Sequence, residues 1–209
     1  MSDPTIYFKE DSPKAEILQA ALDEFVQYGK KGARMQAIAD KAGVNKAMLH
    51  YYFSSKENLH QEVIQRVINH AFSEISATIE ANKEPKEQVR ALIGTYYDFI
   101  AAFPELPHLI LHEINSNPVE IASLFSHIII GDNQAPQTIL HVIRQGTEQK
   151  QFREVDPRQF LITILSSVIF FFVGKPLLTR VLGIEDEEAF IRQRKQHVLD
   201  VLLTSLERK

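Results

Sequence analysis

The stretch from Met35 to Phe53 constrains the fold of this chain more than any other. Its first part repeats apolar residues at the spacing of one buried helix face, at Met35, Ile38, Ala39 and Ala42. Gly43 follows, where a helix ends on a residue that tolerates left-handed backbone dihedrals. Asn45 is a good N-cap for a second helix from Lys46 to Tyr52. The stretch therefore predicts two short helices joined by a tight turn.

The second of these helices has an unusual outer surface. Leu49 and either Tyr52 or Phe53 would face inward, with Val44 buried beneath the turn, and the residues left outside are Lys46, Ala47, Met48, His50 and Tyr51. An ordinary antiparallel helix pair in an all-α core would explain the same spacing, but its outer face would carry the usual mixture of Glu and Lys. A cation, small residues and aromatics instead favour a helix-turn-helix, whose second helix enters the major groove of DNA.

Charge is distributed unevenly along the 209 residues, whose formal net charge is −4. Between Tyr28 and Lys56 there are six basic residues and one acidic residue, Asp40, which gives this segment a formal charge of +5. A locally basic surface is what contact with phosphates requires. There is no cysteine, which excludes disulfides and zinc–thiolate sites.

Four short segments carry a resemblance to a known family: Ile38-Ala39, Ala42-Gly43-Val44, Leu49-His50-Tyr51-Tyr52-Phe53 and Lys56-Glu57-Asn58-Leu59. Together they resemble the DNA-binding domain of the TetR family of transcriptional regulators. The resemblance covers roughly residues 12 to 60 at the level of motifs, and the rest of the chain only in length and helical layout. Two positions depart from the family pattern: Arg34 stands where Thr or Ser commonly caps the first motif helix, and His50 replaces the usual Tyr.

The resemblance implies an all-α protein of two domains. An N-terminal three-helix, helix-turn-helix DNA-binding domain would cover residues 1–55, and a C-terminal helical domain for ligand binding and dimerisation would cover residues 56–209. The sequence contains no alternating strand pattern, which would have argued against this fold. Capping residues and prolines predict the helices 12–29, 54–81, 85–103, 107–115, 118–131, 136–149, 158–179 and 186–207.

The last two helices are unusually apolar. The helix from Arg158 to about Thr179 is hydrophobic on nearly all sides, and such a helix must be covered on all sides. Both helices could fill the core of a larger bundle. We favour a second copy of the chain as the cover, and the family resemblance also implies a homodimer through helices of about 157–181 and 186–207.

Roles in DNA contact can be assigned by residue. Arg34, Gln36, Asn45 and Lys46 would hold phosphate or reach a base, the last two at the N-terminus of the second motif helix. Ala47 and Met48 could meet thymine methyl groups. Phosphates would accept hydrogen bonds from the side chains of His50, Tyr51 and Lys56. Because Arg and Asn base readers are lacking on this helix, DNA shape would also contribute to specificity.

A cavity for an apolar or amphipathic effector is implied chiefly by the resemblance. Its candidate lining combines aromatic and polar side chains: Tyr96, Phe99, Phe103, His108, His112, Phe125, His141, Thr163 and Phe170. His108 and His112 are spaced i, i+4 beside Glu113 and could bind a metal, but an exposed or pocket-lining pair is commoner. We expect no metal and no cofactor.

The function expected is that of a ligand-responsive transcriptional repressor, not an enzyme, which leaves a palindromic operator when a small-molecule effector binds. The N-terminus lacks a signal pattern and the apolar run Val168 to Val173 is too short for a membrane span, so a cytoplasmic protein is expected. Two alternatives remain: a small-molecule- or metal-binding helical protein without operator binding, and an all-α enzyme using His108, His112 and Glu113.

Overall fold

The structure is a computed structural model that describes residues 12–104, 106–116, 118, 119, 121–123, 126 and 135–208. All regular structure in these ranges is helical, which confirms the predicted all-α class. The labelled helices are α1 (Pro13–Gly32), α2 (Met35–Lys41), α3 (Lys46–Phe53), α4 (Lys56–Glu80), α5 (Pro85–Ala102), α6 (Leu106–Ser116), α8 (Ala135–Glu148), α9 (Pro157–Val181) and α10 (Glu187–Leu206). Phe125 and the predicted loop 132–135, except its last residue, lie outside the described residues.

Internal contacts divide the chain into two compact units. Unit 1 comprises Met1–His70 and Leu109–Ile128, and unit 2 comprises Ala71–His108 and Ile129–Lys209. Helix α4 therefore begins in unit 1 and ends in unit 2, and most of α6 belongs to unit 1. The predicted functional division at residue 55 stays a prediction.

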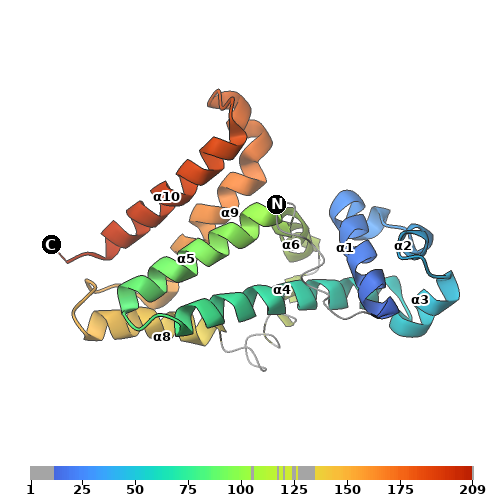
Figure 1. Cartoon of the computed structure of the whole chain (residues 1–209), viewed down its shortest axis with the longest axis horizontal. Helices are drawn as coiled ribbons and strands as arrows, with labels where there is room; N and C mark the ends of the chain where they lie inside the picture. Colours follow the sequence, from blue (N-terminus) through green and yellow to red (C-terminus); the bar gives the residue numbers. More distant parts are fainter. Residues whose placement is uncertain are drawn as a thin grey trace. The chain divides into compact units, whose positions relative to one another are not determined.

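Unit 1 is built on α1, whose start follows the Ser12-Pro13 signal. The Ser12 side chain accepts a hydrogen bond from the Ala15 amide, and Pro13 stands in the first turn, where no amide hydrogen is needed. Gly29, where the sequence predicts the helix end, has non-helical dihedrals (φ 65°, ψ 171°), and one further turn follows to Gly32. Figure 1 shows α1, α2 and α3 lying together beside the first turns of α4. Their shared core contains Ile17, Leu18, Phe25, Ile38, Leu49, Phe53 and Leu59.

The turn between α2 and α3 is closed by backbone hydrogen bonds. The Ala42 amide donates to the Ile38 carbonyl at 2.9 Å, and the Val44 amide to the Ala39 carbonyl at 3.0 Å. Gly43 between them has φ +66°, a dihedral that a residue with a Cβ adopts only at a cost. Val44 is half-buried rather than fully buried beneath the turn. The turn thus has the form that the sequence predicts.

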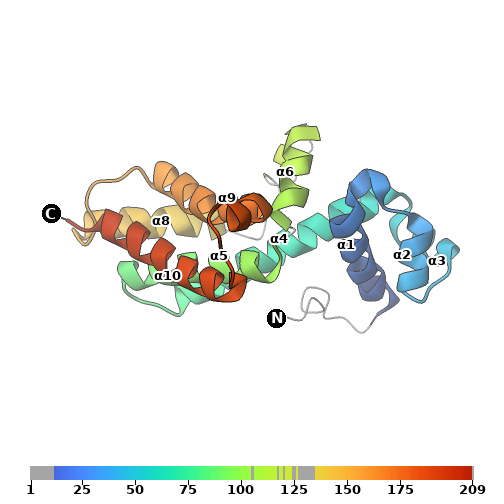
Figure 2. The same ribbon diagram turned by 90° about the horizontal axis from the view of Figure 1, so that it is seen from above.

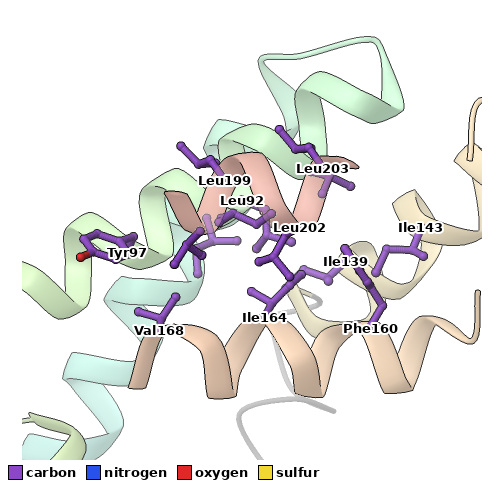
Figure 3. Packing of buried hydrophobic residues seen from close by; sticks show 14 of the residues in the cluster. Leu92, Tyr97, Ile139, Ile143, Phe160, Ile164, Val168, Leu199, Leu202 and Leu203 are labelled. Atoms are coloured by element: carbon purple, nitrogen blue, oxygen red, sulfur yellow. The ribbon is translucent and has the colours of Figure 1, made fainter. Parts of the chain in front are cut away.

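Unit 2 is a bundle in which α5, α8, α9 and α10 pack against one another, as Figures 1 and 2 both show. Figure 3 shows its core, to which α5 contributes Leu92 and Tyr97 and α9 contributes Phe160, Ile164 and Val168. The remaining labelled core residues are Ile139, Ile143, Leu199, Leu202 and Leu203.

Polar bonds join α5 to α10 in this bundle, and close packing fixes the end of α8. The Tyr97 hydroxyl donates to the Ile191 carbonyl at 2.9 Å, and burial raises the pKa of this phenol to about 12. Lys195 pairs with Asp98 at 2.6 Å. At Gly146 the ring of Phe152 packs so closely that a Cβ would stand 2.1 Å from it, so this position requires glycine.

Helix α9 is apolar on more of its surface than unit 2 covers. Phe171 and Phe172 are buried, but Phe170 is 70% exposed. The other exposed apolar residues on α9, the turn after it and α10 are Ile162, Leu165, Leu177, Val181, Leu182 and Val201. Among the described helices α9 alone is long and apolar enough to cross a membrane by length and composition, a test that core helices of soluble proteins also pass, and 22% of its apolar window is buried.

Candidate nucleic-acid interface

Helix α3 presents a distinct outward face. Leu49 and Phe53 are its buried residues, whereas Lys46, Ala47, Met48, His50 and Tyr51 are exposed, as predicted. Tyr51 is 82% exposed and Met48 37% exposed. The sequence left open whether Tyr52 or Phe53 faces inward. Phe53, one helical turn from Leu49, is 3% exposed, and Tyr52 is 37% exposed.

Tyr52 is therefore a surface residue that the sequence analysis did not assign to the interface. Its ring meets that of Tyr51 edge to face, with centroids 5.4 Å apart. The signal that could have identified it is the i, i+4 spacing of Leu49 and Phe53, which aligns two side chains slightly better than i, i+3 does in a helix of 3.6 residues per turn. The interface thus carries two adjacent phenols.

Several polar candidates for DNA contact are engaged within the protein. The side-chain oxygen of Asn45 accepts a hydrogen bond from the Met48 amide at 2.7 Å, which is the predicted N-cap. The Gln36 amide group donates to Asp40 at 2.8 Å. The Nδ1 of His50 lies 3.2 Å from the Ser54 carbonyl, which orients the ring with Nε2 on its opposite side. These bonds hold the three side chains in defined positions.

The cations around α3 are of two kinds. Lys56 donates from Nζ to the carbonyls of Lys31 and Ala33, at 3.4 and 3.3 Å, so this ammonium joins the start of α4 to the last turn of α1 and the residue after it. Lys41 pairs with Asp23 at 2.6 Å and ties α2 to α1. Lys46 is exposed at the first residue of α3 and Arg34 is exposed at the residue before α2. Of the two predicted lysine contacts, Lys46 is thus the more open to a phosphate.

The C-terminal end of α3 is anchored to α1 and α4. The Lys14 ammonium lies 5.5 Å from the centre of the Phe53 ring and 2.7 Å from the Glu62 carboxylate. A cation over a ring and a carboxylate at this distance link three helices at one point. The link thus holds the last residue of α3 in place.

The junction between α3 and α4 contains a strained residue. Ser54 has φ 59° and ψ −44°, and the Ser55 amide donates to the Phe53 carbonyl at 2.6 Å across it. These backbone dihedrals describe a tight three-residue turn that residues other than glycine rarely adopt. The Ser55 hydroxyl accepts from the Asn58 amide at 3.1 Å, so Ser55, and not Ser54, caps α4.

The predicted effector residues are only partly brought together. Tyr96 and Phe99 on α5 and Phe103, the residue after this helix, are half-buried, and the rings of Phe99 and Phe103 are 5.7 Å apart. Burial raises the pKa of Tyr96, whose hydroxyl oxygen is buried and has no hydrogen-bond partner among the described residues. His141, Thr163 and Phe170 are exposed, and the Thr163 hydroxyl donates to the Gln159 carbonyl. These three do not line an interior space with Tyr96.

Two predicted histidines belong to α6, and a buried pair formed by Glu113 of α6 and His60 of α4 lies beside them. His108 and His112 are both exposed. Glu113 is 4% exposed and its Oε1 lies 3.6 Å from Nδ1 of His112 and 3.7 Å from Nε2 of His60, which is 1% exposed. The described residues contain no group of three His, Cys, Asp or Glu side chains that could hold a metal ion.

His60 is the residue of unit 1 whose chemistry the sequence analysis missed. Its ring packs edge to face on Phe25 at 4.7 Å. Burial lowers the pKa of His60 to about 4, and this effect outweighs the opposing charge of Glu113. At neutral pH the contact is therefore between a neutral imidazole and Glu113. At 3.7 Å it is longer than a hydrogen bond.

Comparison with known proteins identifies the class. The family model for bacterial regulatory proteins of the tetR family matches residues 17–63, and the model for the tetracyclin repressor-like C-terminal domain matches residues 85–202. The second match alone spans more than half of the chain. A helix-turn-helix transcriptional regulator is thus the class that fold and sequence define.

Two curated relatives illustrate the similarity. The chain is 26% identical over 195 residues to the HTH-type transcriptional regulator RutR of Escherichia coli K12, covering 92% of this chain and 90% of that protein. It is 34% identical over 90 residues to the HTH-type transcriptional activator FasR of Mycolicibacterium smegmatis, a match that spans 41% of that protein. Among solved structures, the regulator FadR from Bacillus subtilis in complex with stearoyl-CoA superposes with a TM-score of 0.71 at 17% identity, over 92% of this chain and 98% of that one.

The chain belongs to the TetR family of transcriptional regulators. The predicted function, a ligand-responsive DNA-binding transcriptional regulator, is confirmed at the level of this family, and its members are regulators rather than enzymes. The solved structure with stearoyl-CoA is too distant in sequence to carry more than the fold.

Proposed function

We propose that the protein is a repressor that binds a palindromic operator as a homodimer and leaves it when a small apolar or amphipathic effector binds. The outward face of α3, with Lys46 and Tyr51 exposed, is the observation that carries the DNA-binding part. Lys46 and the amides of the first turn of α3 would hold a phosphate. Tyr51 and His50 would donate to others, and Arg34, ahead of α2, would add a further charge.

The proposed dimer uses α9 and α10. Support comes from the apolar residues that unit 2 leaves exposed on these helices, above all Phe170. Large contiguous apolar patches are rare on the surfaces of monomeric proteins, so a second copy of the chain would cover these residues. A two-fold pair would set two copies of α3 in successive major grooves about 34 Å apart.

The proposed effector site lies along α5 in unit 2. A buried hydroxyl without a partner destabilises the protein by roughly 1–3 kcal/mol, and the Tyr96 hydroxyl is such a group among the described residues. An effector with an apolar body and one hydrogen-bonding group would relieve this deficit. Phe99 on the same helix and Phe103, the residue after its end, would contact the apolar body.

A binding experiment tests the DNA-binding part. Duplexes selected from a random pool by the full-length protein should share a palindromic motif, and affinity for it should fall steeply with salt, with a log–log slope of about −0.9 per phosphate contacted. The double variant Lys46→Ala, Tyr51→Ala should lose this binding, whereas Glu80→Ala, an exposed change at the far end of α4, should keep it. A pool without any enriched motif, or a flat salt response, would contradict the proposal.

Operator release tests the effector part. With a selected duplex in hand, metabolite extracts and then single acyl, steroid and aromatic compounds can be screened for release of the labelled DNA. The variant Tyr96→Phe should melt at a higher temperature without effector and should need more effector for release. Release that is identical in Tyr96→Phe would remove this tyrosine from the site.

A further inference from the structure

The centre of the outward face of α3 is mostly hydrocarbon. With 3.6 residues per turn, successive side chains are rotated by about 100° around a helix. Measured from the direction opposite to the buried pair Leu49 and Phe53, Tyr51 lies at the centre, Ala47 about 40° to one side and Met48 about 60° to the other. Ala47 and Met48 are exposed, so a methyl group and a thioether flank the central phenol.

The charged and polar side chains of α3 stand away from the centre of this face. By the same rotation Lys46 lies about 140° from the centre and His50 about 100°. His50 has one ring nitrogen against the Ser54 carbonyl. The His50 side chain therefore points toward the wall of a groove, where the phosphates are. Lys46 lies further back at the first residue of α3, and its long flexible side chain would reach a phosphate from there.

The amide side chains that commonly read adenine are already bonded within the protein. The side-chain oxygen of Asn45 accepts a hydrogen bond from the Met48 amide, and the side-chain nitrogen of Gln36 donates one to Asp40. A bidentate contact with adenine needs both the oxygen and the nitrogen of one amide side chain. The existing bond of each residue fixes the orientation of its amide group and occupies one of its hydrogen-bonding positions.

We propose that α3 reads its half-site through the C5-methyl groups of thymine, with Met48 and Ala47 as the specificity-determining side chains. This inference rests on the proposed operator binding. Thymine is the only base that presents a methyl group in the major groove, so an apolar side chain can distinguish it without a hydrogen bond. The Asn45 cap holds the amide of Met48 at 2.7 Å and so fixes the turn that carries both residues.

Modified bases test the proposal on the DNA side. In the selected duplex each thymine is replaced in turn by deoxyuridine, which lacks only the methyl group. At the positions read by Met48 and Ala47 the affinity should fall by about fourfold per methyl, the factor that corresponds to about 0.8 kcal/mol for one buried carbon. Replacing T·A there by 5-methylcytosine·G should reduce affinity less than replacing it by C·G, because the modified cytosine restores the methyl.

Protein variants locate the contact. Met48→Ala should bind the thymine and deoxyuridine duplexes with nearly equal affinity at the position under residue 48. Lys46→Ala is the matched control on the same turn: it should weaken binding to both duplexes by a similar factor and keep the fourfold difference between them. Both residues are exposed and alanine favours helix, so both variants should retain the helical circular dichroism of the parent protein.

The outcomes separate this inference from the operator proposal. If no duplex is enriched, operator binding itself fails and the inference with it. If a palindrome is enriched and deoxyuridine has no effect at any position, operator binding stands and the methyl readout is overturned. The assignment of these residues would also be overturned if the effect of removing a thymine methyl group were the same in Met48→Ala, and in Ala47→Gly, as in the parent protein.

Discussion

Arg34 precedes the first residue of α2 and forms no side-chain hydrogen bond with the amides of that helix. Its own amide donates to the Glu24 carboxylate at 3.2 Å. Ser or Thr at this position would cap the helix, and a cap of this kind is worth about 1 kcal/mol. An arginine here gives up that stabilisation and places a cation at the proposed DNA surface.

The substitution Arg34→Ser should therefore have opposite effects on folding and on binding. The gained cap should raise the melting temperature by about 2–4 °C for a chain of this size. The lost phosphate contact should weaken operator binding and reduce the salt slope by about 0.9. Calorimetry and a salt titration of binding measure the two effects. Arg34→Gln is the control that removes the charge without adding a cap. Equal melting temperatures of all three proteins would contradict the capping argument.

His60 makes the stability of the protein depend on pH. Its pKa in the folded protein is lowered to about 4, whereas an unfolded histidine titrates near 6.5. The neutral imidazole is thus favoured by the fold, and this contribution is fully present above pH 6.5 and is lost as the pH falls toward 4. The shift corresponds to a loss of up to about 3 kcal/mol over this window, at about 1.4 kcal/mol per pKa unit.

Urea unfolding at pH 7, 6 and 5 measures this dependence. The fall in unfolding free energy between pH 7 and pH 5 should be smaller in His60→Gln than in the parent protein, because glutamine does not titrate. Carboxylates that titrate in the same window contribute equally to both proteins. His141→Gln, at an exposed position, should behave like the parent. Parallel pH profiles for His60→Gln and the parent would rule out the buried imidazole as the cause.

At the scale of the elements, the junction of α3 and α4 holds the strained Ser54. Glycine accepts a positive φ without the clash of a Cβ, so Ser54→Gly should raise the unfolding free energy by about 1 kcal/mol. Ser54→Ala, which keeps the Cβ, should not. Urea titrations of the three proteins give the comparison. A gain in Ser54→Ala equal to that in Ser54→Gly would show that the hydroxyl, and not the backbone, is responsible.

The helices of this protein could be predicted closely because their ends are marked in the sequence. Ser12-Pro13 and Asp156-Pro157 start α1 and α9, and both cap side chains accept a hydrogen bond from the helix. Gly29 and Gly43 stand where helical dihedrals end. Prolines and caps act within a few residues, so a linear pattern records them.

The site could be predicted only in part, because its missing features depend on contacts between distant residues. The outward face of α3 followed from periodicity. No periodic pattern in the sequence indicates that Lys56 binds carbonyls 23 and 25 residues away. The same holds for the burial of Glu113 against His60. Exposure of Thr163 and Phe170 likewise depends on which faces of α9 the other helices of unit 2 cover.

At the scale of the whole molecule, the proposed dimer can be broken at one residue. Phe170→Glu would place a charge in each half of an apolar interface, where an unpaired charge is strongly unfavourable. The dimer dissociation constant should rise by more than about 100-fold, equivalent to about 2.7 kcal/mol, and operator binding should fall with it. Sedimentation velocity and a gel-shift assay measure both.

Val119→Glu is the matched control for this change. Val119 is 82% exposed and belongs to unit 1, so a glutamate there should leave the dimer intact. The Phe170→Glu protein should keep its helical circular dichroism, since Phe170 is 70% exposed in one chain. A Phe170→Glu protein that sediments as a dimer would move the interface away from this face of α9.

The segment Leu109–Ile128 packs with unit 1 although it falls inside the C-terminal family region that begins at residue 85. The family regions and the internal contacts thus divide the chain at different residues. A chimeric regulator made by joining residues 1–83 to a foreign effector module would leave His60 without its Glu113 neighbour. The DNA-binding unit could therefore be transferred to another regulator only together with the segment Leu109–Ile128, which packs with it.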